Sequence, residues 1–224
     1  METAWKAFLS SGLADYTADR EFHPALKIYL FVAVLYHCAY RLTRGEKQGK
    51  IIHTGGVSVD EKEISCCFTG HRPVKLPWGM NENDPRCMAM KLELAARLEG
   101  IYDMGYRRFL CGMAIGCDMY FAEAVIALRE SYPDVKLEAA IPCGTQPDKW
   151  NAAQRQRYNR LIDSADTVTV LQYAYTSDCM MRRNQYMVDH ASLLLACFNG
   201  KPGGTMKTIL YAERSGLKTV IVDI

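Results

Sequence analysis

The sequence lacks the short motifs that assign many proteins to a class at once. None of its nine cysteines forms a C-x-x-C pair, so a zinc ribbon or a thioredoxin-type site has no support. A Walker A loop, G-x-x-x-x-G-K-S/T, is also missing. The net charge of +2 gives no overall attraction to duplex nucleic acid or to an anionic membrane, so neither is expected as a partner.

A hydrophobic run long enough to span a membrane is missing near the start of the chain. The run from Ala25 to Tyr40 has about 16 residues where a span needs roughly 20, and it carries Lys27 and His37. Met1 is not followed by the basic segment of a signal peptide, so a cytoplasmic protein is expected. We predict that the run forms a helix packed against the main domain or a second copy of the chain, and we therefore expect a homo-oligomer; a short membrane or interfacial segment is the alternative.

The remaining composition is that of an ordinary globular protein. Hydrophobic residues make up 49% of the 224 positions and charged residues 23%. Most cysteines lie inside apolar runs such as Ser65–Phe68, which predicts buried, reduced thiols.

Three segments of different character follow one another. Residues 1–45 are predicted to form a helical extension, 46–63 a linker, and 64–224 a domain in which strands and helices alternate. Strands are expected at 64–69, 108–111, 135–141, 167–171, 193–198 and 219–222, and helices at 84–104, 117–131, 150–162, 178–190 and 203–215. This alternation predicts an α/β fold with a doubly wound, mainly parallel sheet of about six strands. Ligands of such sheets bind beyond the carboxyl ends of the strands.

The segment after the first strand offers a turn and two donors. Gly70 allows the backbone to turn tightly beside a ligand, and His71 and Arg72 place donors at the rim for a phosphate. A glycine turn with solvated polar side chains is the alternative.

The segment after the second strand is built from small residues. Gly112, Met113, Ala114 and Gly116 permit close approach of a ligand to a helix start, although G-x-x-x-G is not the dinucleotide fingerprint G-x-G-x-x-G. Asp118 is a candidate for a helix cap, a ribose contact, a metal contact or a catalytic group. Glu123 is a second catalytic candidate, but a spacing of five residues does not place it beside Asp118 on the helix.

The segment after the fifth strand carries the strongest signal for anion binding. Gly203, Gly204 and Thr205 predict a nest of backbone N–H groups at a helix start that can hold phosphate. Arg183 is a candidate partner of phosphate, and Asn184 could contact a nucleobase or cap a turn.

Several of these segments together resemble the YpsA-like branch of the SLOG superfamily, which is named for DprA (Smf) and the cytokinin-activating LOG enzymes. The similarity covers roughly residues 64–224 and rests on the segments 67–73, 112–118, 140–143, 183–189 and 203–205. It implies a Rossmann-like domain that binds a nucleotide or a nucleotide-derived ligand such as NAD or ADP-ribose. It also implies a sensor role in bacterial stress or cell-division control.

The resemblance leaves three functions open. The first is a cytosolic nucleotide-ligand binding protein with no assigned metal site, for which Mg²⁺ is a candidate companion. The second is an N-glycosidic hydrolase like the LOG enzymes, although Pro202–Thr208 lacks the second G-T and the glutamate of the LOG pattern P-G-G-x-G-T-x-x-E. The third is a single-stranded DNA or protein-interaction module of the DprA type.

Overall fold

The computed structural model describes residues 60–224. The predicted helical extension over 1–45 and most of the predicted linker over 46–63 lie outside the described residues. The boundaries of these two segments therefore stay predictions.

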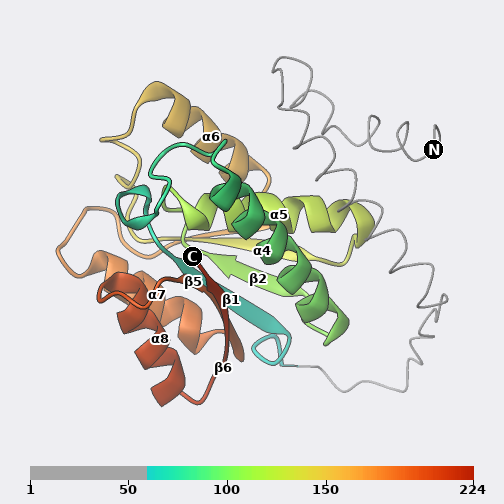
Figure 1. Ribbon diagram of the computed structural model, residues 1–224. Coiled ribbons are helices and arrows are strands. Elements are labelled where there is room, and N and C mark those ends of the chain that lie inside the picture. The colour runs from blue at the N-terminus through green and yellow to red at the C-terminus, as the bar shows by residue number, and fades with distance from the viewer. Residues whose placement is uncertain (1–59) are drawn as a thin grey trace. The chain divides into compact units, whose positions relative to one another are not determined.

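A single parallel sheet of six strands organises the described part (Figure 1). The strands are β1 (Ser65–Gly70), β2 (Arg108–Cys111), β3 (Lys136–Ile141), β4 (Thr167–Val170), β5 (Leu193–Phe198) and β6 (Lys218–Asp223). Their order across the sheet is β4-β3-β2-β1-β5-β6, and every pair is parallel. The predicted α/β fold with a parallel sheet of six strands is confirmed.

Helices cover both faces of the sheet (Figure 1). They are α4 (Pro85–Asp103), α5 (Cys117–Ser131), α6 (Ala152–Asp163), α7 (Cys179–Asp189) and α8 (Gly204–Arg214), with a short 3₁₀ turn η1 (Pro73–Lys75) after β1. α4, α5 and α6 lie on one face, and α7 and α8 lie on the other. The sheet is therefore doubly wound, as predicted.

Neighbouring residues of one strand belong to opposite hydrophobic cores. Phe109 packs into the core with α4 and α5, whereas Leu110 packs into the core with α7 and α8. Leu195 and Leu194 of β5 divide in the same way. A strand buried on both faces needs apolar residues throughout, which is why these strands show no polar alternation in the sequence.

Local signals set the helix ends. Asp84 accepts a hydrogen bond from the backbone N–H of Arg86 at 2.9 Å, and Pro85 occupies the first helical position of α4. The predicted start of α6 at Trp150 is wrong by two residues, because Asn151 and Gln154 form a reciprocal capping box that begins the helix at Ala152.

The strand order reverses between β1 and β5. β2, β3 and β4 extend the sheet on one side of β1, and β5 and β6 extend it on the other. The connections after β1 and β5 therefore leave the sheet in different directions, and a crevice opens at the carboxyl ends of these two strands.

The cysteines and the surface agree with the composition. The eight described cysteines are buried and free, and burial raises the pKa of the Cys67 thiol to about 12.

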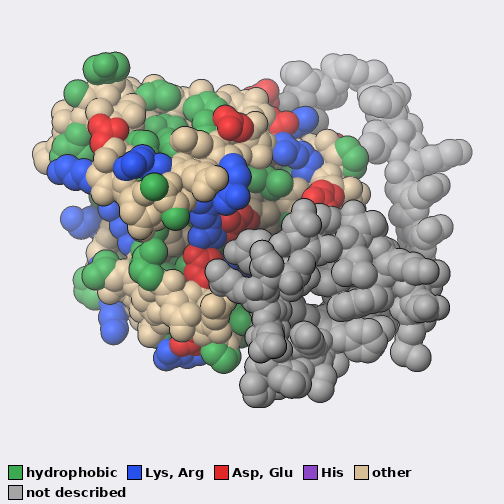
Figure 2. Space-filling model, turned by 90° about the horizontal axis from the view of Figure 1, so that it is seen from above, with side chains coloured by type: hydrophobic (Ala, Val, Ile, Leu, Met, Phe, Trp, Pro, Cys, Tyr) green, Lys and Arg blue, Asp and Glu red, His purple; other side chains and the backbone are tan. Residues whose placement is uncertain are grey.

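Figure 2 shows one face of the molecule, on which Lys and Arg side chains lie among acidic and apolar ones. Within residues 60–224, none of the helices combines the length and apolar character needed to cross a bilayer.

Candidate functional site

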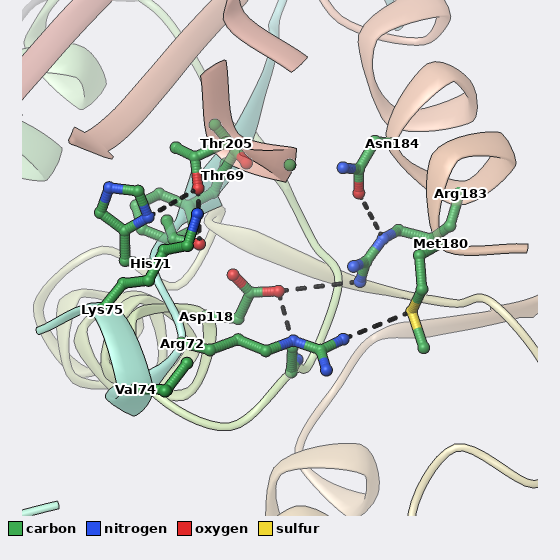
Figure 3. A pocket seen from close by; sticks show the side chains of 14 residues that line it. Thr69, His71, Arg72, Val74, Lys75, Asp118, Met180, Arg183, Asn184 and Thr205 are labelled. Atoms are coloured by element: carbon green, nitrogen blue, oxygen red, sulfur yellow. Dashed lines mark hydrogen bonds and ion pairs between the residues drawn. The ribbon is translucent and has the colours of Figure 1, made fainter. Parts of the chain in front are cut away.

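A cavity of about 190 Å³, lined by both polar and apolar residues, lies at the carboxyl ends of β1 and β5, where the strand order reverses (Figure 3). Its walls come from the end of β1, the η1 turn, the start of α5, α7 and the start of α8. The topology therefore brings segments that are more than a hundred residues apart to one place.

Most of the predicted binding residues line this cavity. They are Gly70, His71, Arg72, Ala114, Asp118, Arg183, Asn184, Gly204 and Thr205. Gly112, Met113, Gly116 and Gly203 do not line it but lie behind its walls. The loop after β2 and the start of α8 thus contribute opposite sides of one cavity, with the end of β1 between them.

The glycines of the loop after β2 make room for neighbouring groups. A Cβ at Gly112 would overlap the guanidinium group of Arg183. Gly116 has a φ of +101°, and a Cβ there would lie 2.8 Å from the His71 carbonyl oxygen. The N–H of Cys117 donates to that carbonyl at 3.2 Å, so the two loops are held together at the start of α5.

Hydrogen bonds from Gln146 stabilise the same loop. Met113 adopts a φ of +54°, which is uncommon for a residue other than glycine. The Gln146 side chain is buried, and its Nε2 donates to the carbonyls of Gly112 and Met113 at 3.2 and 3.0 Å. Gln146 therefore stabilises the strained backbone beside the cavity.

Asp118 and Arg183 form a buried pair at the base of the cavity. Arg183 Nη1 lies 3.7 Å from Asp118 Oδ2, and both side chains are less than a tenth exposed. Asp118 Oδ2 also accepts from the Ala114 N–H at 3.2 Å, and Arg183 Nε donates to Asn184 Oδ1 at 2.8 Å. Arg183 Nη1 has no hydrogen-bond partner among the described residues.

Burial has a larger effect than the ion pair on the pKa of both Asp118 and Arg183. Desolvation raises the pKa of Asp118 although Arg183 opposes the shift, and desolvation lowers the pKa of Arg183 although Asp118 opposes it. The pair is therefore incompletely compensated. Asp118 is also not the helix cap that the sequence left open, because Gly116 is the N-cap of α5 and Asp118 lies in its first turn.

His71 is buried, whereas the sequence predicted a donor at the rim of the site. Its side chain is buried, with Nε2 2.7 Å from Asn199 Oδ1 and Nδ1 3.2 Å from Thr205 Oγ1. Asn199 Nδ2 donates to the Lys75 carbonyl, so Oδ1 faces the imidazole and accepts the Nε2 proton. Burial lowers the pKa of His71, with Lys75 adding to the shift and the Asn199 hydrogen bond opposing it. A neutral ring thus joins β1 to the start of α8.

Cations occupy the rim (Figure 3). Arg72 is exposed, and its Nη2 lies 3.6 Å from Met180 Sδ, a weak acceptor. Lys75 Nζ donates to the Pro202 carbonyl at 2.7 Å. Lys75 and Met180 were not identified from the sequence; a cation in the loop that leaves β1 was the available signal for Lys75.

Glu123 does not line the cavity. It pairs with Arg157, whose Nε and Nη2 lie 2.7 and 2.6 Å from the two carboxylate oxygens. Five residues correspond to roughly 140° around a helix, so Glu123 lies on a different side of α5 from Asp118. Among the described residues that line the cavity, Asp118 is the only acidic one.

The start of α8 presents backbone donors to the cavity. Gly203 is the N-cap and provides no side-chain cap, and a Cβ at Gly204 would have no described atom within 4 Å apart from its chain neighbours and its own helix backbone. The first N–H groups of a helix favour an anion. No group of three His, Cys, Asp or Glu side chains in residues 60–224 is arranged to hold a metal ion.

Comparison with known proteins identifies a family. The model of the YspA SLOG family (YpsA) matches residues 66–218. The uncharacterized SPbeta prophage-derived protein YoqJ of Bacillus subtilis strain 168 is 26% identical over 147 residues, which cover 60% of this chain and 86% of YoqJ.

Two solved structures are similar to this chain at low sequence identity. One, described as showing the single-stranded DNA binding mode of DNA processing protein A from Helicobacter pylori, gives a TM-score of 0.50 and 11% identity over 75% of this chain and 68% of that chain. DprA from Streptococcus pneumoniae gives a TM-score of 0.49 and 14% identity over 72% of this chain, which spans half of the length of the pneumococcal protein.

Proposed function

The chain belongs to the YspA SLOG family, and we propose that it binds a nucleotide or a nucleotide-derived ligand through phosphate in the cavity between β1 and β5. NAD and ADP-ribose are the ligands that the proposal favours, and a sensor role follows from binding without turnover. A cytoplasmic location belongs to the same proposal.

The observation that carries this proposal is the buried Arg183 Nη1 without a hydrogen-bond partner among the described residues. Buried polar groups are almost always hydrogen-bonded, and leaving a charged donor unsatisfied is costly. The Arg183 side chain that carries this donor lines the cavity. A phosphate oxygen would satisfy it.

The charge around the cavity supports the same conclusion. Arg72, Lys75 and Arg183 line it, whereas Asp118 is the only acidic lining residue that the structure describes. The N-terminus of α8 adds backbone donors. An anion is therefore the ligand type that this environment stabilises best.

Native mass spectrometry of the purified full-length chain tests the proposal. The protein is measured as isolated and after mixing with AMP, ADP-ribose and NAD. We expect at least one nucleotide to bind at one molecule per chain. Failure of all three to bind, with no retained ligand, would count against the proposal, and the same spectra report the expected homo-oligomer.

A hydrolase is a second candidate because Asp118 lines the cavity and burial raises the pKa of its carboxyl group. A raised carboxyl pKa suits a general acid that assists departure of a base. Base release from AMP or NAD that is lost in Asp118→Asn would favour hydrolysis. The absence of turnover across a nucleotide panel would favour binding alone.

Nucleic acid is a further candidate because the Helicobacter pylori structure is described as binding single-stranded DNA. The expectation that nucleic acid is no partner of this chain is therefore not supported. Figure 2 shows no continuous basic band on the face that it presents. Salt-sensitive binding of an oligonucleotide would favour this function over a small ligand.

A further inference from the structure

A second hollow of about 600 Å³ adjoins the first cavity. Its walls come from the η1 turn with the residues after it, from the segment that follows β5 and from Ile224 after β6, and its lining residues include Leu76, Pro77 and Lys201. The two hollows share Val74 and Lys75. A ligand that leaves the first cavity along Lys75 would enter the second one.

Lys75 lies at the boundary between the two hollows. Its Nζ donates to the Pro202 carbonyl at 2.7 Å, which fixes the amine against the turn before α8. A Cβ at Gly203 would overlap this amine. The only side-chain hydrogen bond that the structure gives Lys75 goes to a neutral carbonyl, so a phosphate could take the place of that acceptor with a gain in charge pairing.

The second hollow has an excess of positive charge. Lys75 and Lys201 line it, and no aspartate or glutamate among the described residues does so. Both lysines lie close enough to His71 to lower its pKa, so their fields act on the same small region. Two cations that share a hollow favour an anion there.

The size of the first cavity also supports a ligand that extends beyond it. A cavity of about 190 Å³ is smaller than the roughly 300 Å³ at which pockets for drug-sized ligands begin. It can hold a phosphate with part of a sugar. The remainder of a larger ligand must lie outside it, and the second hollow provides both space and charge.

We propose that the second hollow binds the distal part of an extended ligand that carries a second phosphate, such as a dinucleotide or an ADP-ribose-like molecule. The near phosphate occupies the first cavity, so this inference rests on the proposed function. Lys75 lies between the two parts and pairs with the phosphate that crosses the boundary. Lys201 contacts only the distal part.

Isothermal titration calorimetry of the full-length protein with AMP and ADP-ribose tests the inference. The variant is Lys201→Gln, because Lys201 lines the second hollow and not the first. We expect the variant to weaken ADP-ribose about tenfold and AMP by less than about twofold, since one charge-assisted contact is lost. Lys218→Gln is the matched control, an exposed lysine at the start of β6, and should change neither affinity.

The outcomes separate this inference from the proposed function. If Lys201→Gln weakens both ligands equally, or neither, the assignment of the second hollow is wrong while nucleotide binding stands. Tighter binding of AMP than of ADP-ribose by the unaltered protein would also overturn it. If neither ligand binds the unaltered protein, the proposed function fails and the inference fails with it.

Discussion

The guanidinium group of Arg183 occupies the space that a side chain at position 112 would need. A Cβ on Gly112 would overlap Nη1 and lie close to the other guanidinium atoms. The absence of a side chain after β2 is therefore tied to the burial of a cation on α7, although 71 positions separate the two residues in the sequence. This relationship explains why the first glycine of the loop is needed even though it does not touch the cavity.

Gly112→Ala is predicted to destabilise the fold. The added methyl group must displace Arg183 from a buried position, and such overpacking costs about 1–3 kcal/mol of unfolding free energy. Urea denaturation measures the change. Gly100→Ala in the interior of α4 is the matched control, because no atom of the described residues lies within 4 Å of a Cβ there; it should leave stability equal or raise it by up to about 1 kcal/mol. Equal effects of the two substitutions would contradict the packing argument.

Gly204→Asp is predicted to remove ligand binding without harming the fold. Gly204 lines the cavity, a Cβ there has open space apart from its chain neighbours and its own helix backbone, and an acidic residue suits the first turn of a helix. The melting temperature without ligand should therefore stay equal or rise. The stabilisation by ADP-ribose or NAD should disappear, because the carboxylate occupies the anion site and repels phosphate. Retained stabilisation would refute the placement of phosphate at the start of α8.

The sequence predicted the fold well because its strands end at strong local signals. β2, α5 and β5 have the predicted bounds, and glycine closes β1 and follows β2. The loops after parallel strands must gather at one edge, so Gly70 and Gly204 could be placed near each other from topology alone. These parts of the prediction depend on backbone geometry, which local sequence determines.

The side chains of the site were predicted less well because their directions depend on packing between elements. Glu123 follows Asp118 on the same helix, but its carboxylate pairs with Arg157 of α6. His71 has the sequence context of an exposed donor, yet Asn199 and Thr205 enclose it. The contacts that decide both outcomes join residues more than thirty positions apart, which spacing along the chain does not reveal.

The stability of the protein is predicted to fall on mild acidification through His71. Burial lowers the pKa of this group below its usual 6.5, so the unfolded chain binds a proton before the folded one does. The contribution of neutral His71 is complete above pH 6.5 and is lost as the pH falls from there through the lowered folded pKa. Urea unfolding at pH 7.5, 6.5 and 5.5 should show the loss in the unaltered protein and a smaller loss in His71→Gln. An identical pH dependence of the two would contradict this role.

Arg183→Lys is predicted to weaken ligand binding while the protein stays folded. The loss of affinity should be larger than that caused by the same substitution at an exposed arginine. Lysine keeps a positive charge near Asp118, but its single nitrogen cannot occupy the positions of both Nε, which donates to Asn184, and Nη1, which is proposed to donate to a phosphate. Its affinity for ADP-ribose should fall by about tenfold or more, the effect of one lost charge-assisted hydrogen bond. Arg182→Lys provides the matched control, since that neighbouring side chain is exposed and pairs with Asp178 outside the cavity. Calorimetry of both variants is decisive: equal losses would show that the burial of Arg183 has no part in binding, whereas a loss confined to position 183 would assign the unpartnered nitrogen to the ligand.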